Sequence, residues 1–162
     1  MRIGIVSNAG RGSSILAEQI AKEYNLPCLL NKAITGPILK RDRFDYASGQ
    51  RVESFLSSPA RQREIFEKTK EQLSGLDSFV SDRTFISLAT YHLIELNMRI
   101  PIDSFINDCK EMSKIYTHVF FIPWSSNILN NKKRTINPWY QFEVSAVSLQ
   151  IADYFGVSMF EI

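Results

Sequence analysis

The first twenty residues, MRIGIVSNAGRGSSILAEQI (residues 1–20), decide the fold. Residues 2–6 form a nearly continuous apolar run without an acidic residue, which is typical of a strand buried on both faces. The run ends in the small polar stretch 7–14, and apolar side chains then recur at helical spacing until Asn25. A strand, a tight loop and a helix in this order predict the opening unit of an α/β sheet.

The alternation of strand and helix patterns continues along the chain. Short apolar runs predict further strands at 27–30, 78–82, 117–123 and 157–162. Helical patterns are expected at 60–73, 85–98, 103–116 and 139–155. Between residues 31 and 60, Gly36-Pro37 and similar punctuation predict only short helical or looped pieces. The sequence therefore predicts one domain, residues 1–162, built as a three-layer α/β sandwich around a mainly parallel five-stranded sheet.

Composition narrows the class of protein. The chain is 44% hydrophobic and 22% charged, and its formal net charge of +2 disfavours a nucleic-acid coat or a polybasic membrane anchor. Cys28 and Cys109 have no metal or disulfide spacing, which predicts reduced thiols. The first apolar run is too short for a signal-peptide core, and no run approaches the ~20 residues of a spanning helix. We expect a soluble, cytoplasmic protein.

The polar stretch 7–14 (SNAGRGSS) lies where a phosphate-binding P-loop would lie, between a strand and a helix. In the P-loop pattern GxxxxGK[ST], backbone amides wrap the phosphates, the lysine reaches the β- and γ-phosphates, and the hydroxyl helps to hold Mg²⁺. Gly12 and Ser14 fit this pattern, but Ser7 replaces its first glycine and Ser13 replaces its lysine. Taken alone, the stretch fits a helix-capping turn equally well. The predicted phosphate-binding residues are Asn8, Ala9, Gly10, Arg11, Gly12, Ser13 and Ser14.

Three further segments resemble a known family. Residues 81–84 (SDRT), followed by 89–91 (ATY), resemble the segment "DR[ST]…D…AY" of small P-loop ATPases and kinases related to the nicotinamide riboside kinase and deoxynucleoside kinase group. Residues 116–123 (YTHVFFIP) resemble that group's "YD-V-FYLP" strand. Lys133-Arg134, before a helix that ends in residues 154–157 (YFGV), resembles its basic lid segment and last helix. The resemblance spans nearly the whole chain in the same order and implies a P-loop NTPase fold of nucleotide-kinase type with a degenerate Walker A motif.

The resemblance also implies catalytic roles. Asp82 matches an acid that lies near the metal and phosphates, where it organises Mg²⁺ water or accepts the proton of the acceptor hydroxyl. With Ser14, it forms the predicted metal site. Arg83 matches an arginine that contacts a phosphate or the acceptor, and Arg134 is the best candidate for a lid cation within the loop at about 125–138. The structural alternatives are a helix cap at Asp82, a surface ion pair at Arg83, and a solvated loop for Lys132-Lys133-Arg134.

An acceptor site is the least specific prediction. Arg41, Arg43 and Arg51 lie among aromatic residues in the region where related kinases hold their acceptor, so that as a group they suggest an anionic substrate. The alternative is a helical surface with its aromatic residues packed inward. Trp124 and Trp139 flank the lid loop, where they would clamp an adenine or pack in the interior; we expect interior packing.

These observations favour an ATP- and Mg²⁺-dependent phosphotransferase that acts on a nucleoside, nucleotide or related small-molecule acceptor. Either Arg11 or a lid cation must then supply the charge of the missing lysine. The alternative is a catalytically impaired nucleotide-binding or protein-interaction module on the same fold, because Ser13 removes the lysine on which such enzymes depend. The sequence leaves open whether the acceptor is a free nucleotide or a base within DNA, and whether the chain forms a homodimer.

Overall fold

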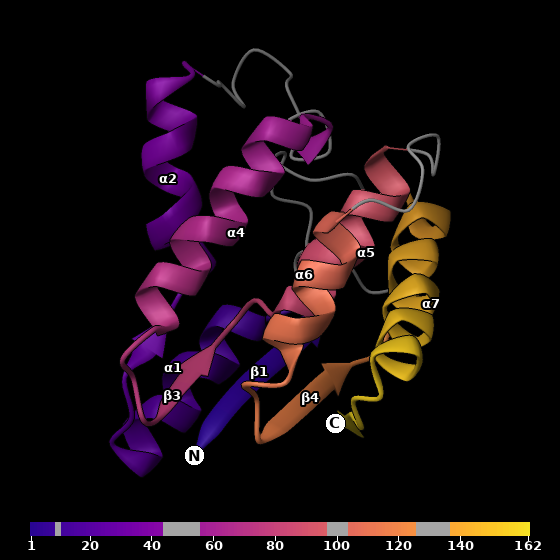
Figure 1. The fold of residues 1–162 in the computed structure, drawn as a ribbon. Coiled ribbons are helices and arrows are strands. Elements are labelled where there is room, and N and C mark those ends of the chain that lie inside the picture. Colours follow the sequence, from indigo (N-terminus) through magenta and orange to yellow (C-terminus); the bar gives the residue numbers. More distant parts are fainter. Residues whose placement is uncertain (9–10, 44–55, 97–103, 126–136) are drawn as a thin grey trace.

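A computed structural model describes residues 1–8, 11–43, 56–96, 104–125 and 137–162 of the chain. Its centre is a five-stranded sheet in the order β2-β3-β1-β4-β5, in which all four strand pairs are parallel (Figure 1). The strands are β1 (Arg2–Ser7), β2 (Cys28–Leu29), β3 (Phe79–Ser81), β4 (His118–Ile122) and β5 (Phe160–Glu161). The prediction of a parallel five-stranded sheet is confirmed.

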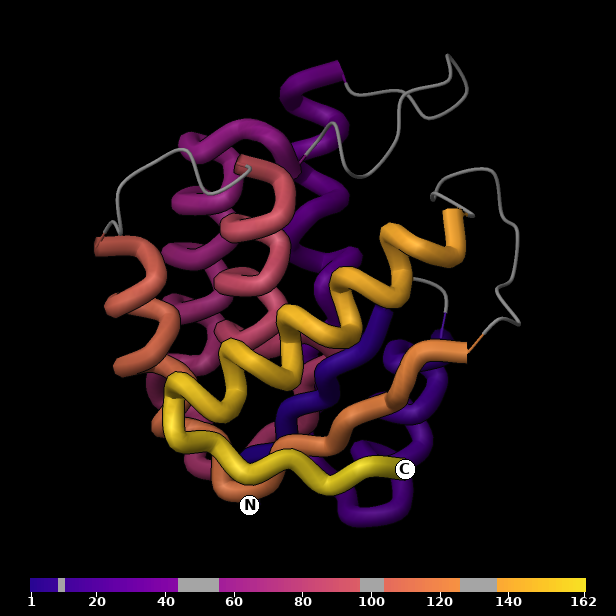
Figure 2. Tube along the Cα trace, turned by 90° about the vertical axis from the view of Figure 1, so that its right-hand side faces the viewer, coloured from indigo at the N-terminus to yellow at the C-terminus, as the bar shows by residue number. Residues whose placement is uncertain are grey.

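Six helices of the described residues connect and cover the strands. They are α1 (Ser13–Tyr24), α2 (Asn31–Arg41), α4 (Pro59–Leu73), α5 (Phe85–Glu95), α6 (Ser104–Ser113) and α7 (Pro138–Phe155). Figure 2 shows α1 on the opposite side of the sheet from α4, α5 and α6. No helix in the described ranges has both the length and the apolar character that crossing a membrane requires.

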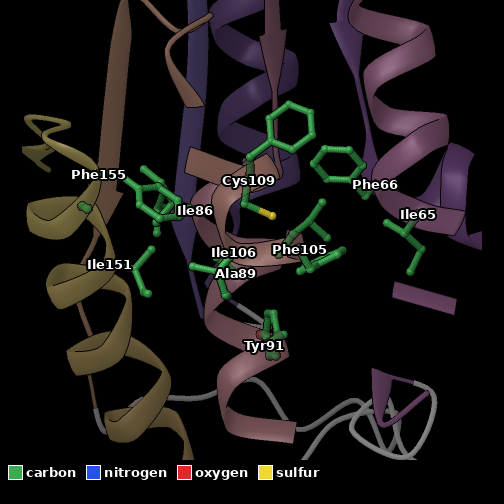
Figure 3. Close-up of a cluster of buried hydrophobic side chains, with 14 of the residues drawn as sticks. Ile65, Phe66, Ile86, Ala89, Tyr91, Phe105, Ile106, Cys109, Ile151 and Phe155 are labelled. Carbon is green, nitrogen blue, oxygen red and sulfur yellow. The ribbon is translucent and has the colours of Figure 1, made fainter. Parts of the chain in front are cut away.

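Alternating side chains of β1 build a separate core on each face of the sheet. Ile3 and Ile5 pack with Ala17 and Ala21 of α1, whereas Val6 belongs to the larger core on the other face. Figure 3 shows part of that larger core, which includes Ile65, Phe66, Ile86, Ala89, Phe105, Ile106, Ile151 and Phe155 from α4, α5, α6 and α7. The two cores confirm the predicted three-layer sandwich, since each face of a buried sheet needs its own covering helices.

The helix α2 corrects a prediction. Gly36-Pro37 was expected to break this region, yet one helix of 11 residues runs through both residues. Pro37 removes a backbone donor from the helix interior, which ordinarily weakens a helix. The burial of Ile34 and Ile38, which are 3% and 1% exposed, holds the helix against the core in spite of this loss.

Gly4 allows the helix layer to approach the central strand. A Cβ atom at Gly4 would lie 2.5 Å from Cγ2 of Thr84 and 2.9 Å from Cδ1 of Tyr116. Thr84 is the N-cap of α5, where its side chain accepts a hydrogen bond from the backbone of Ser87. The absence of a side chain at Gly4 thus determines how closely the start of α5 packs on β1.

We therefore expect Gly4→Ala to lower the free energy of unfolding by roughly 1–3 kcal/mol, because the added methyl overpacks a fully built core. Gly36→Ala is the matched control, since a Cβ there meets nothing within 4 Å. In a helix this control should be neutral or stabilising by up to about 1 kcal/mol. Urea unfolding monitored by circular dichroism measures both changes. Equal unfolding midpoints for Gly4→Ala and the unmodified protein would contradict the close packing of α5 on β1 at Gly4.

Candidate active site

The loop between β1 and α1 ends at Gly12, which has a φ of 82° in the left-handed region. Glycine adopts this conformation without the strain that other residues would suffer. The Gly12 carbonyl accepts a hydrogen bond from the backbone of Leu16 at 2.9 Å, so that α1 begins directly after it. The first amides of a helix have no partner within the helix and attract anions. Of the predicted phosphate-binding residues, Ala9 and Gly10 lie outside the described residues.

Asp82 and Ser14 meet at this end of the sheet, although 68 residues separate them in the sequence. The Ser14 hydroxyl donates a hydrogen bond to Oδ2 of Asp82 at 2.5 Å. The backbone N–H of Asn31 donates to Oδ1 of the same carboxylate at 2.6 Å. Asp82 follows β3, Ser14 follows the loop after β1, and Asn31 follows β2. The carboxyl ends of three adjacent parallel strands therefore converge on one carboxylate.

These oxygen atoms fit the predicted magnesium site. Mg²⁺ prefers oxygen ligands and is usually bound by one or two carboxylates together with waters and substrate phosphates, rather than by an all-protein cage. Ser14 and Asp82 supply a hydroxyl and a carboxylate at one point. Within the described ranges there is no group of three or more His, Cys, Asp or Glu residues arranged to hold a metal ion. The donor set is thus suited to a cation that arrives with a phosphate ligand.

Two arginines of the predicted site lie near Asp82 or Ser14 in the sequence. Arg83 follows Asp82 directly, and its guanidinium lies 5.4 Å from the ring of Tyr91 in α5. Its Nη1 atom is buried and has no hydrogen-bond partner among the residues that the structure describes. Buried cationic donors are normally paired, so that Nη1 is suited to an anionic ligand. Arg11, next to Gly12, is half-buried, and it brings a second guanidinium to the loop.

Two residues beside the loop were missed by sequence reasoning. The Asn31 side chain has a buried Oδ1 without a partner in the described part of the chain, and its place directly after a predicted strand was the available signal. Cys28 lies in β2. Burial raises the pKa of its thiol, and the negative charge of Asp82 raises this pKa further. The thiol therefore remains protonated at neutral pH.

The predicted acceptor arginines do not converge on this site in the described residues. Arg41 forms ion pairs with Asp42 at 2.8 Å and with Glu64 at 2.7 Å, and Arg61 contacts the same Asp42 at 2.8 Å. The hydrogen bonds from Arg41 and Arg61 lower the pKa of Asp42 to about 2. These pairs join the end of α2 to α4, which gives Arg41 a structural use. Arg43 is exposed, and Arg51 lies outside the described residues, as do Lys132, Lys133 and Arg134.

Asn8 connects the loop to α7 through its side chain. Asn8 is 2% exposed, and its Nδ2 donates a hydrogen bond to the backbone carbonyl of Gln141 at 2.5 Å. Gln141 lies in the first turn of α7, next to Tyr140, whose hydroxyl donates to Glu95 of α5. The Asn8 side chain is therefore used within the fold. The predicted contact of Asn8 with a phosphate would then be made by its backbone. No sequence pattern indicates a pairing across 133 residues.

The two tryptophans correct a second prediction. Trp139 is 77% exposed and Trp124 is 37% exposed, whereas interior packing was expected. Trp139 lies in the first turn of α7 on the side away from the core, because Gln141, Val144 and Ser148 occupy the buried face of that helix. His92, by contrast, lies in the core, where its Nδ1 is hydrogen bonded to Gln62 and its ring stacks on Phe105.

The strand order β2-β3-β1-β4-β5, with a loop after β1 and a carboxylate after β3, is the arrangement of a nucleotide-kinase fold. Comparisons with solved structures support this fold. All of this chain aligns with 90% of the deoxyadenosine kinase from M. mycoides with bound dATP, at a TM-score of 0.67 and 11% identity. A structure of the same kinase with the products dCMP and dCDP gives a TM-score of 0.62 at 12% identity, over all of this chain and 89% of that chain.

The YorR protein from Bacillus subtilis, in complex with phosphorylated GDP, aligns with all of this chain over 85% of its own length, at a TM-score of 0.59 and 14% identity. No family model and no curated protein matches the sequence. At these identities the shared property is the fold, and the chain has the fold of the P-loop nucleotide kinases.

The link between the loop and α7 predicts a stability change. Asn8→Ala removes a buried hydrogen bond and should lower the free energy of unfolding by about 1–2 kcal/mol. Gln19→Ala is the control, because this amide side chain lies exposed on α1 and should change stability by less than about 0.5 kcal/mol. Guanidinium unfolding curves provide the comparison, and equal losses for both variants would show that the bond to Gln141 contributes nothing.

Proposed function

We propose that this chain is an ATP- and Mg²⁺-dependent phosphotransferase whose acceptor is a nucleoside, a nucleotide or a related small molecule. The observation that carries the proposal is the hydrogen bond between Ser14 and Asp82 at the end of the loop that opens α1. It joins a hydroxyl and a carboxylate where helix amides favour an anion. Support also comes from the solved structures with this fold, which contain dATP, dCMP with dCDP, and phosphorylated GDP.

In this proposal the donor phosphates lie along residues 8–14, held by backbone amides and by the guanidinium of Arg11. Ser14 and Asp82 would hold Mg²⁺, which would supply positive charge to the phosphates of the donor. The acceptor hydroxyl oxygen forms a bond to the γ-phosphorus while the bond to the bridging oxygen breaks. Arg83, whose Nη1 is buried without a partner among the described residues, would supply positive charge to the transferring group and so stabilise the transition state.

The carboxylate of Asp82 is better arranged to hold a metal than to act as a base. Both of its oxygens already accept a hydrogen bond, one from Ser14 and one from the backbone of Asn31. These two bonds fix the orientation of the carboxylate. A carboxylate that hydrogen bonds hold in one orientation is suited to bind a metal ion. We therefore assign the acceptor's proton to a water molecule or to the phosphate oxygens.

Ser13 favours a second candidate function, a nucleotide-binding or protein-interaction module without catalysis. The loop offers a hydroxyl where the P-loop pattern has a lysine, and electrostatic stabilisation is the main protein contribution to phosphoryl transfer. Arg11 and Arg134 are the proposed replacements for that charge. In either function we place the protein in the cytoplasm, with a soluble nucleotide as its ligand.

Substitution of the carboxylate tests catalysis. Asp82→Asn should reduce phosphate transfer from ATP to a panel of nucleosides and nucleotides by at least about a hundredfold, because the amide carries no charge for the metal. Asp77→Asn is the control, since Asp77 is an exposed acid at the opposite end of the same strand. Product formation is followed by anion-exchange chromatography. Undiminished transfer by Asp82→Asn would remove this residue from the mechanism.

Thermal unfolding tests binding separately from transfer. At a ligand concentration a hundredfold above Kd, ATP with Mg²⁺ should stabilise the protein by about 2.7 kcal/mol, which corresponds to a Tm increase of roughly 5–10 °C. Chelation of Mg²⁺ should remove part of this Tm shift, and Ser14→Ala should reduce that Mg²⁺-dependent part. A Tm shift without transfer to any acceptor would favour the module over the enzyme. No shift at millimolar ATP would contradict both the enzyme and the nucleotide-binding module.

A further inference from the structure

Three aromatic side chains lie exposed beside the loop, and we call Trp124, Trp139 and Phe142 the aromatic platform. They are 37%, 77% and 50% exposed, respectively. The ring of Phe142 lies 5.9 Å from that of Trp124 and 6.4 Å from that of Trp139, with interplanar angles of 88° and 81°. In such edge-to-face contacts the rings stabilise one another, and their exposed fractions leave part of each side chain accessible to a ligand.

The platform borders the start of the loop. Ser7 of β1 pairs with Ile122 of β4; Asn8 follows Ser7 directly, and Trp124 lies two residues after Ile122. The Asn8 side chain is bonded to the carbonyl of Gln141, which lies in α7 between Trp139 and Phe142. The loop and the platform are therefore connected by the sheet on one side and by a buried hydrogen bond on the other.

Packing among the residues that the structure describes does not account for the exposed rings of Trp139 and Phe142. The buried face of α7 is formed by Gln141, Val144, Ser145, Ser148, Ile151, Ala152 and Phe155. Trp139 and Phe142 lie outside that face, and large exposed aromatic groups that gather in one place mark a site of interaction. Flat heteroaromatic rings stack on such side chains without needing a specific hydrogen-bond pattern.

The loop at residues 7–14, beside the aromatic platform, indicates which ligand the platform binds. A site that joins an anion-binding helix terminus to a ring-stacking surface suits a molecule that carries both phosphates and a flat ring. We propose that the aromatic platform stacks the base of the donor nucleotide whose phosphates lie along the loop. This inference rests on the proposed function and adds to it the group that recognises the donor's base.

Intrinsic fluorescence provides a direct test, because the chain has only two tryptophans and both belong to the platform. ATP with Mg²⁺ should change the tryptophan emission with the half-saturation concentration that calorimetry gives for binding. Inorganic tripolyphosphate with Mg²⁺ should bind, compete with ATP and leave the emission unchanged, since it has no ring to stack.

Variants of the platform separate the base from the phosphates. Trp139→Ala and Phe142→Leu should each weaken ATP binding about tenfold and leave tripolyphosphate affinity within about twofold, because each removes one ring. Tyr154→Ala is the matched control: Tyr154 is a 57% exposed aromatic residue on the same helix, far from its first turn. This control should leave both affinities unchanged.

Three outcomes would overturn the inference. If ATP binds without changing the emission, and the ratio of ATP to tripolyphosphate affinity is the same in every variant, the platform does not hold the base while the proposed function stands. If neither ligand binds, the proposed function fails and the platform's assignment fails with it. If the emission depends on protein concentration without nucleotide, and sedimentation shows an oligomer that Trp139→Ala dissolves, a second copy of the chain occupies the platform.

Discussion

The hydrogen bond from the Ser14 hydroxyl to the Asp82 carboxylate depends on how β1 and β3 pair. The two strands run parallel in one register, with Gly4 opposite Ser81, so that their carboxyl ends leave the sheet side by side. Gly4 has no side chain, and this lets Thr84 and the start of α5 pack against β1 directly after Asp82. A change in this register or spacing would move the carboxylate away from the loop. The site is therefore a consequence of core packing several residues beneath it.

In the proposed function, an anion binds at the loop without the usual lysine, and arginines near the loop supply the positive charge. A P-loop lysine is a mobile point charge, whereas Arg11 and Arg83 carry planar guanidinium groups that bind phosphate oxygens in pairs. The Nη1 atom of Arg83 is already buried without a ligand. Folding has therefore already removed water from this atom, and ligand binding need not do so. Preorganised charge of this kind is most effective in stabilising a transition state.

Much of the fold could be predicted from local patterns, because each element is specified by residues near it. The α1 helix begins at Ser13 and ends before Asn25, whose φ of 52° stops it, and Gly156 with a φ of 70° ends α7 in the same way. Prediction failed where distant contacts decide. Burial of Ile34 and Ile38 keeps α2 intact through Pro37, and the bond from Asn8 to Gln141 has no local signal. In the site, the meeting of Ser14 with Asp82 was predictable because parallel strands end at one edge, whereas the partners of Arg41 were not.

Stacking at the aromatic platform and charge at the loop would contribute to different steps. A base held on Trp139 or Phe142 is held equally in the ground state and in the transition state, so that it strengthens binding without accelerating transfer. The lysine of a P-loop acts mainly on the transferring phosphate, so that stacking cannot replace it. A chain with the platform but without effective loop cations would therefore bind nucleotide tightly and transfer phosphate slowly. The balance between enzyme and binding module thus depends on whether the proposed cations, Arg11, Arg83 and Arg134, reach the γ-phosphate, and not on how well the base is recognised.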